Sequence, residues 1–372
     1  MIARLRLSPR LLGLIALCLV PALAIAAPPR LVGYVGSKDD PAHIEAGKLS
    51  ALIYAFAHIK EGRVMLDAHD AAAFEKLRAL KRQNPKLKLL ISVGGWTAGG
   101  FSDAALDAAS RQRFADSAMA LLQKMHADGL DVDWEYPGHH ESGITSRPSD
   151  KAHFTALLKA VRHAMAQGSA KPGAPAHYLL TAALADGPFV DHVNLKAVAA
   201  QLDWINAMTY DFNNSMTKTT GNHAGLFASA VSHKASDRTT ARAVRQYEAA
   251  GVPANKIVIG AAFYSRAFTD VLGRDHGLYQ PYGKYVASYP WPQLVAKYID
   301  KNGFKRYWDA KAKAPYLWNA KTRTFITYDD PQSLRAKAVF VKRQHLGGIM
   351  YWEQSLDPHN TLFDALAKGL GR

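Results

Sequence analysis

The sequence predicts a (β/α)8 barrel of the TIM type, in which eight parallel strands close into a ring inside a layer of helices. From Arg30 onward, short apolar or β-branched runs alternate with longer segments of helical period, which is typical of parallel strands joined by crossover helices. Eight such units within about 340 residues indicate a closed barrel rather than an open sheet. The 372 residues are 48% apolar and 21% charged, which excludes disorder as the main state and allows a large core.

Residues 1–26 are expected to be an export signal. Arginines lead an apolar run at residues 11–20, and Ala24 and Ala26 form a small-residue cleavage site. The apolar run is shorter than the roughly 20 residues of a membrane-spanning helix, which disfavours the alternative of an uncleaved anchor. We therefore expect a mature chain from Ala27, residues 27–372, that is secreted or periplasmic and has no membrane segment after cleavage.

Cysteine content and charge limit the possible functions further. The chain has a single cysteine, Cys18, inside the expected signal, so a disulfide framework and a cysteine zinc site are excluded. The net charge of +15 favours adsorption to anionic surfaces. The basic residues are spread along the chain without a block interleaved with aromatics, so no nucleic-acid partner is expected.

The strands and helices follow one another in the order that a barrel requires. The predicted strands are residues 31–35, 49–57, 87–94, 129–135, 178–184, 204–210, 257–263 and 348–352. Helical stretches are predicted between them at residues 71–82, 103–127, 151–166, 239–250 and 333–345.

The interval between the seventh and eighth strands is longer than one helix requires. Residues 268–325 are rich in Tyr, Trp, Gly and Pro, which predicts a small α+β insertion subdomain. Its aromatic side chains either form one wall of a cleft or pack within the insertion, and we expect core packing for more than half of them.

The densest functional signal is the run DGLDVDWEYP at residues 128–137. Side chains alternate along a strand, so Asp131, Asp133 and Glu135 share the inward face, about 7 Å apart from one to the next. Like charges this close cannot all ionise cheaply, so at least one carboxyl is expected to hold a proton near neutral pH. A glycosidase needs such an acid to protonate a leaving oxygen, and Glu135 lies at the carboxyl end of the strand, where barrel active sites form.

A metal cluster or a buried ion network is the alternative reading of these three carboxylates. The strand offers no neighbouring histidine, which argues against a transition metal and leaves calcium as the metal to consider. We expect no metal and no organic cofactor.

The motif at residues 128–137 resembles the fourth strand of family 18 glycoside hydrolases, the chitinases. The run SVGGW at residues 92–96 is similar to the third strand of that family, and MTYD at residues 208–211 is similar to the sixth. Residues 54–57, 260–266 and 347–352 are similar to its second, seventh and eighth strands. These matches occur in the order of the family and span nearly the whole mature chain.

The resemblance implies retaining hydrolysis of β-1,4-linked N-acetylglucosamine in which the substrate supplies its own nucleophile. Glu135 matches the general acid, and Asp133 matches the carboxylate that orients the acetamido group. Asp131 matches the inner partner that shares a proton with Asp133, and Tyr210 matches a phenol that hydrogen-bonds the acetamido group. The implied partner is chitin or a chitooligosaccharide, bound by a monomer.

The resemblance also implies a set of substrate-binding residues. Trp352 would floor the subsite of the distorted sugar, and Trp96 would lie on the leaving-group side. Further matching positions are Tyr34, Phe56, Gly95, Tyr136, Met208, Asp211 and Arg266. Core packing is the alternative for Tyr34, Phe56 and Met208, because such residues fill barrel interiors.

Two other functions remain open at this point. A chitinase-like lectin would share the barrel, but such lectins usually lack the acid that Glu135 supplies here. An endo-β-N-acetylglucosaminidase acting on N-glycan or wall glycan would keep the chemistry and change the polymer. The first strand, at residues 33–37, lacks the tryptophan that often follows it in chitinases, which leaves the far donor-side subsites and the endo or exo mode undetermined.

Overall fold

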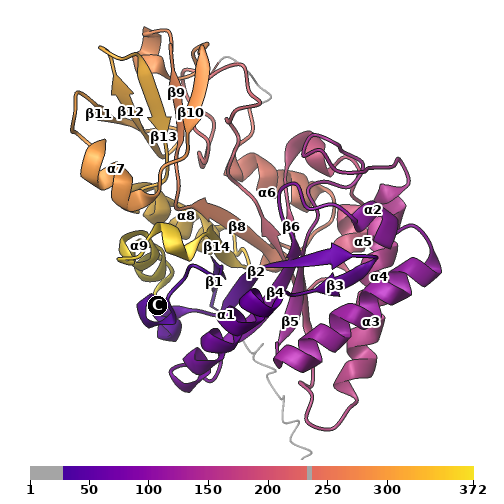
Figure 1. Cartoon of the computed structure of the whole chain (residues 1–372). Coiled ribbons are helices and arrows are strands. Elements are labelled where there is room, and N and C mark those ends of the chain that lie inside the picture. The colour runs from indigo at the N-terminus through magenta and orange to yellow at the C-terminus, as the bar shows by residue number, and fades with distance from the viewer. Residues whose placement is uncertain (1–27, 233–236) are drawn as a thin grey trace, which may run out of the picture.

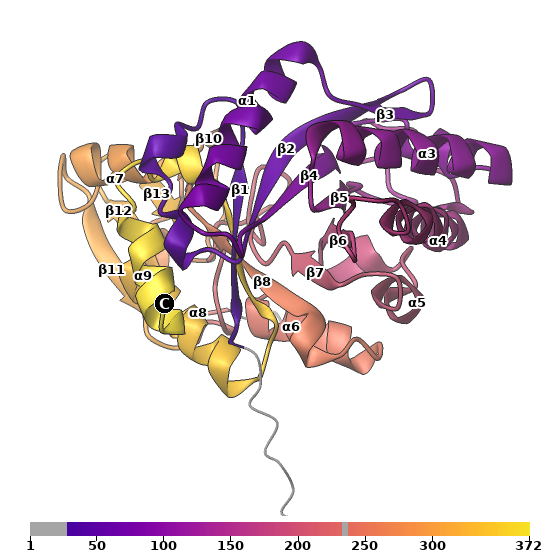
Figure 2. The same cartoon turned by 90° about the horizontal axis from the view of Figure 1, so that it is seen from below.

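The computed structural model of the chain describes residues 28–232 and 237–372, and the expected signal at residues 1–26 lies outside them. Eight parallel strands form a closed ring, because β1 pairs with both β14 and β2, as the view in Figure 2 shows. The predicted (β/α)8 barrel is therefore confirmed. Its strands are β1 (Arg30–Val35), β2 (Ala51–Lys60), β4 (Lys88–Gly94), β5 (Gly129–Asp133), β6 (Leu179–Leu184), β7 (Trp204–Ala207), β8 (Ile257–Ala262) and β14 (Gly348–Trp352).

Alternation along each strand separates two apolar layers. On β1, Leu31 and Val35 face the helices, whereas Val32 and Tyr34 pack inside the ring. Directly after β5, the outward-facing Trp134 is fully buried and stacks on Phe101 with ring centroids 5.3 Å apart. The inward positions of β5 are carboxylates, so the interior of the barrel is polar at this strand.

Helices surround the ring, and several of them begin at a side chain that caps the first turn. The Asp107 carboxylate accepts from the Ser110 N–H at 2.8 Å at the start of α3, and Asp330 forms a capping box with Ser333 at the start of α8. The helices around the barrel are α1 (Ala68–Arg78), α2 (Phe101–Ala104), α3 (Ala108–Met125), α4 (Asp150–Ser169), α5 (Leu195–Ala199), α6 (Thr240–Ala249), α8 (Pro331–Arg343) and α9 (Thr361–Leu370). Sequence periodicity did not identify α5, α9 or the short strand β3 (Arg63–Met65), which extends β2 as a hairpin.

Two predicted strands end two or more residues earlier than expected. The strand at residues 129–135 stops at Asp133, whose partner Gly94 is the last residue of β4 and has a φ of 120°. Residues 134 and 135 therefore have no ladder partner on that side. The strand at residues 204–210 stops at Ala207, because the Thr209 hydroxyl takes over the hydrogen bonds of Gly260, donating to its C=O at 3.0 Å and accepting from its N–H at 2.8 Å.

A second sheet of five antiparallel strands lies between β8 and β14 in the sequence and stands at the upper left of Figure 1. Tyr316, Trp318, Phe268 and Phe325 form a small core of its own, so these aromatics serve packing rather than a cleft wall. Its elements, in the spatial order of the strands and followed by the helix, are β10 (Lys284–Ala287), β9 (Arg266–Thr269), β13 (Thr324–Thr327), β12 (Ala314–Asn319), β11 (Lys305–Asp309) and α7 (Trp291–Lys297).

An ion pair is buried where this sheet returns to the barrel. Lys337 of α8 donates to Asp329, and both side chains are at most 1% exposed. The Asp329 carboxylate also accepts from the Ser333 hydroxyl at 2.7 Å and from the N–H of Ala262 at 3.2 Å. The pair therefore ties α8 to the end of β8.

Within the described residues, the structure contains no helix that is both long and apolar enough to cross a membrane.

Replacing Lys337 by Met should lower the free energy of unfolding by about 3–5 kcal/mol, because the substitution leaves the Asp329 charge buried without its partner. Guanidinium unfolding at pH 7 measures the loss. The control is Lys342→Met on the same helix, where the side chain is exposed and the expected change is within about 0.5 kcal/mol. Equal stability of the two variants would contradict this assignment.

Candidate active site

A cavity of about 500 Å³ opens at the carboxyl ends of the barrel strands. Barrel strands present their loops at this end, where side chains from several strands converge. The residues that line it include most of those predicted from the sequence, namely Tyr34, Phe56, Trp96, Asp133, Glu135, Tyr136, Met208, Tyr210, Asp211, Arg266 and Trp352.

Asp131 lies below the cavity, fully buried, and is held by four side-chain donors. Its Oδ2 accepts from Tyr34 at 3.0 Å and Ser92 at 2.8 Å. Its Oδ1 accepts from Thr181 at 2.5 Å and Asn206 at 3.1 Å. Burial raises the pKa of Asp131, and these four hydrogen bonds offset part of that rise.

Asp133 and Glu135 lie above Asp131 and have fewer hydrogen-bond donors around their carboxyl groups. Burial, followed by the charges of Glu135 and Asp131, raises the pKa of Asp133 well above its ordinary value. Its Oδ1 is buried and has no hydrogen-bond partner among the described residues. Burial, together with the charge of Asp211, raises the pKa of Glu135 to about 7, although a hydrogen bond with Tyr136 opposes the shift. Asp131, Asp133 and Glu135 form a carboxylate column, and this column therefore holds protons near neutral pH.

Two phenols face the same carboxylates. Burial and the nearby charge of Asp131 raise the pKa of Tyr34 well above its ordinary value, and burial and the charge of Asp133 do the same for Tyr210. Both phenols therefore stay neutral at physiological pH. A neutral Tyr210 at the cavity wall can donate a hydrogen bond to a ligand oxygen.

Aromatic rings form the floor and one rim of the cavity. Trp352 stacks on Phe56 with centroids 5.6 Å apart and an interplanar angle of 23°, and it lies 5.5 Å from the ring of Tyr34. Trp96 is 46% exposed and lies 6.2 Å from the ring of Tyr136. A floor with flat apolar faces and an exposed indole at the rim suits stacking against sugar rings.

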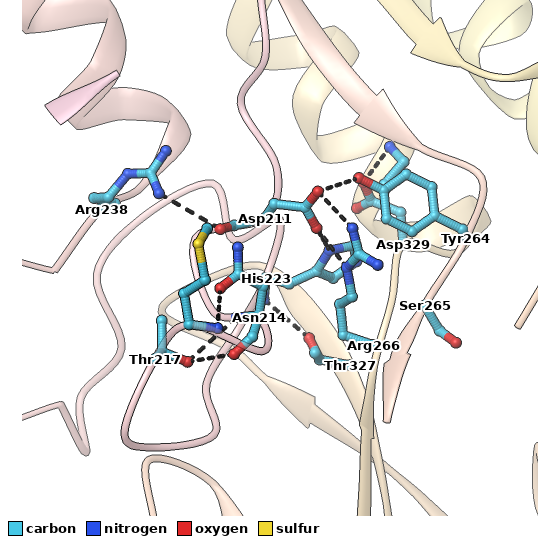
Figure 3. Close-up of polar contacts among 12 residues, drawn as sticks. Asp211, Asn214, Thr217, His223, Arg238, Tyr264, Ser265, Arg266, Thr327 and Asp329 are labelled. Atoms are coloured by element: carbon cyan, nitrogen blue, oxygen red, sulfur yellow. Dashed lines mark hydrogen bonds and ion pairs between the residues drawn. The ribbon is translucent and has the colours of Figure 1, made fainter. Parts of the chain in front are cut away.

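Asp211 carries a charge at the opposite wall. Arg266 donates to both of its oxygens at 2.6 Å, and the Tyr264 hydroxyl donates at 3.0 Å (Figure 3). Burial favours the neutral acid, but His223 and the bidentate Arg266 outweigh it and hold the pKa of Asp211 well below its ordinary value. The cavity thus contains a fixed anion at Asp211 and a protonatable acid at Glu135.

Gly95 and Asp131 are the two predicted site residues that do not line the cavity. Gly95 has a φ of 96°, and a Cβ there would lie 2.7 Å from the ring of Phe56. Its N–H donates to the C=O of Asp133 at 2.9 Å. Gly95 therefore lets the chain turn closely behind the floor of the cavity.

Sequence reasoning missed several lining residues, and all of those named below except Tyr264 lie outside the strand motifs. They come from the segments after β6, β7, β8 and β14 and from the second sheet, where no periodic pattern marks which side chain faces the cavity. The missed residues include Phe189, Asn214, Ser215, Met216, Arg238, Tyr264, Tyr285, Ser288 and Leu356.

A candidate metal-binding group lies outside the cavity. Among the residues that the structure describes, the one group with three candidate ligand atoms within 4.8 Å of one another is His58, Asp67 and Asp70. None of the three lines the cavity.

Comparisons with known proteins agree with this geometry. The model of the glycosyl hydrolases family 18 matches residues 30–357. Chitinase A1 of Niallia circulans is 41% identical over 315 residues, which make up 81% of this chain and 45% of that protein. Chitotriosidase-1 of Mus musculus is 34% identical over 332 residues, covering 87% of this chain and 70% of that protein.

A solved structure is similar over almost its whole length. The family 18 N-acetylglucosaminidase from Paenibacillus barengoltzii has a TM-score of 0.86 and 40% identity, covering 92% of this chain and 99% of that one. The chain thus spans less than half of chitinase A1 but the full barrel of the Paenibacillus enzyme. The family match, the closed barrel and the carboxylate column of β5 together show that this chain belongs to family 18 of the glycosyl hydrolases.

Proposed function

We propose that this protein is a secreted chitinase that hydrolyses β-1,4-linked N-acetylglucosamine chains with retention of configuration. The observation that carries the proposal is Glu135, an acid with a pKa of about 7 beside the buried carboxyls of Asp133 and Asp131. This column opens into a cavity floored by Trp352. One of the two relatives is named a chitinase and the other a chitotriosidase, which supports the same polymer.

The first step breaks the glycosidic bond. Glu135 gives its proton to the glycosidic oxygen as the bond from that oxygen to the anomeric carbon breaks. The carbonyl oxygen of the sugar's own acetamido group attacks the anomeric carbon on the opposite face, which produces an oxazolinium ion and an ionised Glu135. The sugar is held by stacking on Trp352.

Asp133 and Tyr210 stabilise the positive charge that develops on the acetamido group. The unpaired Oδ1 of Asp133 is available to accept the acetamido N–H, and the neutral phenol of Tyr210 can hydrogen-bond the group from the side. In the second step Glu135 takes a proton from water, and the water oxygen attacks the anomeric carbon. The bond from that carbon to the acetamido oxygen breaks, which opens the oxazolinium ring. Two inversions give net retention, and Glu135 is protonated again.

Release of single N-acetylglucosamine units from chain ends is a second candidate. The Paenibacillus structure, which this chain covers almost completely, is named an N-acetylglucosaminidase. The chemistry at Glu135 would be the same, and the length of the products distinguishes the two modes. The expected signal at residues 1–26 supports export toward a polysaccharide outside the cytoplasm.

Replacing Glu135 by Gln should reduce turnover of chitin hexamer by at least about 10²-fold, because the amide cannot donate the proton. Binding of the oligosaccharide should stay within about tenfold of wild type, because the amide keeps the shape of the acid. Product analysis by length and anomer measures turnover, and tryptophan fluorescence measures binding. Glu141→Gln, at an exposed position, is the control; β-anomer products from the Glu135 variant at the wild-type rate would remove Glu135 from this role.

The pH profile should have its alkaline limb near pH 7. The reaction needs protonated Glu135, and because its pKa is raised to about 7, kcat/KM should fall about tenfold per pH unit above that value. The charge of Asp211 contributes to this raised pKa, so Asp211→Asn should move the limb to lower pH. A limb that stays in place in the Asn variant would show that Asp211 does not influence the acid.

Replacing Asp133 by Ala should lower kcat by about 10²–10³-fold, because the acetamido group loses the acceptor that orients it. The matched substrate-side experiment uses a fully deacetylated oligomer with the wild-type protein, which should release no product because the nucleophile is missing. Cleavage of that oligomer at the rate of chitin hexamer would exclude substrate assistance.

A further inference from the structure

The side chain behind Asp211 is a histidine that sequence motifs did not identify. His223 is fully buried and does not line the cavity. Its backbone is fixed at both ends of the residue, because its N–H donates to the Thr327 hydroxyl at 3.1 Å and its C=O accepts from the N–H of Phe212 at 3.0 Å. Phe212 directly follows Asp211, so the ring of His223 is held against the segment that presents Asp211.

The imidazole of His223 points at Asp211 but makes no hydrogen bond to it. Its Nδ1 lies 3.6 Å from Oδ1 of Asp211, just beyond hydrogen-bond length, and its ring centroid lies 5.4 Å from that of Tyr264. Neither ring nitrogen has a hydrogen-bond partner among the described residues. A buried imidazole without partners is costly, and the nearest acceptor, Asp211, is also the charged group of the cavity wall (Figure 3).

The charges around the ring favour a neutral imidazole as donor. Burial and the positive charge of Arg266 lower the pKa of His223, whereas Asp211 and Asp329 act in the opposite direction, and the net shift is downward. The charge of Asp329 is itself paired with Lys337. The neutral tautomer with a proton on Nδ1 can donate to Asp211 without adding a second cation beside Arg266.

We propose that His223 is a positioning residue for the reaction, which as its Nδ1–H tautomer donates to Asp211 and fixes that carboxylate toward the bound sugar. Arg266 and Tyr264 hold Asp211 from β9 and the end of β8, and His223 adds a third contact from the loop after β7. That loop also brings Asn214 and Arg238 to the cavity. The inference rests on the proposed hydrolysis and adds a residue to it.

Two substitutions separate donation from packing. His223→Asn keeps an N–H donor at the distance of Nδ1, whereas His223→Phe keeps a ring of similar size and removes the donor. We expect the Phe variant to lose about 10- to 100-fold in kcat/KM on chitin hexamer and the Asn variant to stay within about threefold of wild type. The pKa of Asp211 should rise toward its ordinary value in the Phe variant alone, because the ionised carboxylate loses one donor, so loss of activity at low pH should begin at higher pH in that variant.

Nitrogen NMR of the imidazole tests the same contact without turnover. The signal of His223, identified by its loss in the Asn variant, should show a neutral ring protonated on Nδ1 at neutral pH. A proton on Nε2, or an imidazolium at neutral pH, would overturn the proposal. It would also be overturned by wild-type kcat/KM in the Phe variant, or by equal losses in both variants accompanied by equal falls in melting temperature.

The wild-type protein distinguishes this failure from that of the proposed function. Absence of chitin hydrolysis by the wild type would contradict the chitinase proposal, while the NMR experiment would still decide whether His223 donates to Asp211. Hydrolysis by the wild type with unchanged His223→Phe kinetics would contradict only the role of His223.

Discussion

The buried carboxylate of Asp131 is the interaction on which the catalytic side of this barrel depends. It sits on β5 and accepts hydrogen bonds from Tyr34 on β1, Ser92 on β4, Thr181 on β6 and Asn206 on β7. A charge placed without partners in a barrel interior would be very unfavourable, and four donors from four different strands satisfy it. The same contacts fix the register of β5 relative to its neighbours, and hence the height at which Asp133 and Glu135 enter the cavity.

The cavity contains acidic residues with opposite behaviour, and the difference lies in their donors. Asp211 faces His223 and a bidentate guanidinium, which keep it ionised although it is buried. The charges of Glu135 and Asp131 act on Asp133, and the charge of Asp211 acts on Glu135. Burial and like charge therefore favour the protonated forms of Asp133 and Glu135. The same residue types therefore serve as a permanent anion and as a proton donor within one cavity.

Much of this site could be predicted from the sequence because strand geometry is regular. A period of two places Asp131 and Asp133 on the inner face and Trp134 on the outer face, whatever the rest of the fold does. The loops have no such period. Met216, Arg238 and Tyr285 reach the cavity only because the segment after β7 and the second sheet return toward the barrel. The ends of β5 and β7 were also misplaced, since they depend on Gly94 and on the Thr209 hydroxyl in neighbouring segments.

The sequence by itself determined the barrel, the order of its strands and the carboxylate column, because hydrophobic periodicity and the alternation of side chains are local properties of the chain. Only the tertiary structure decided which groups surround each carboxylate. Donors to Asp131 come from residues 39 to 97 positions away, and Tyr264 and Arg266, which donate to Asp211, lie more than 50 positions away from it. Protonation depends on these distant partners and on burial, so the chemical role of each acid follows from folding rather than from its motif.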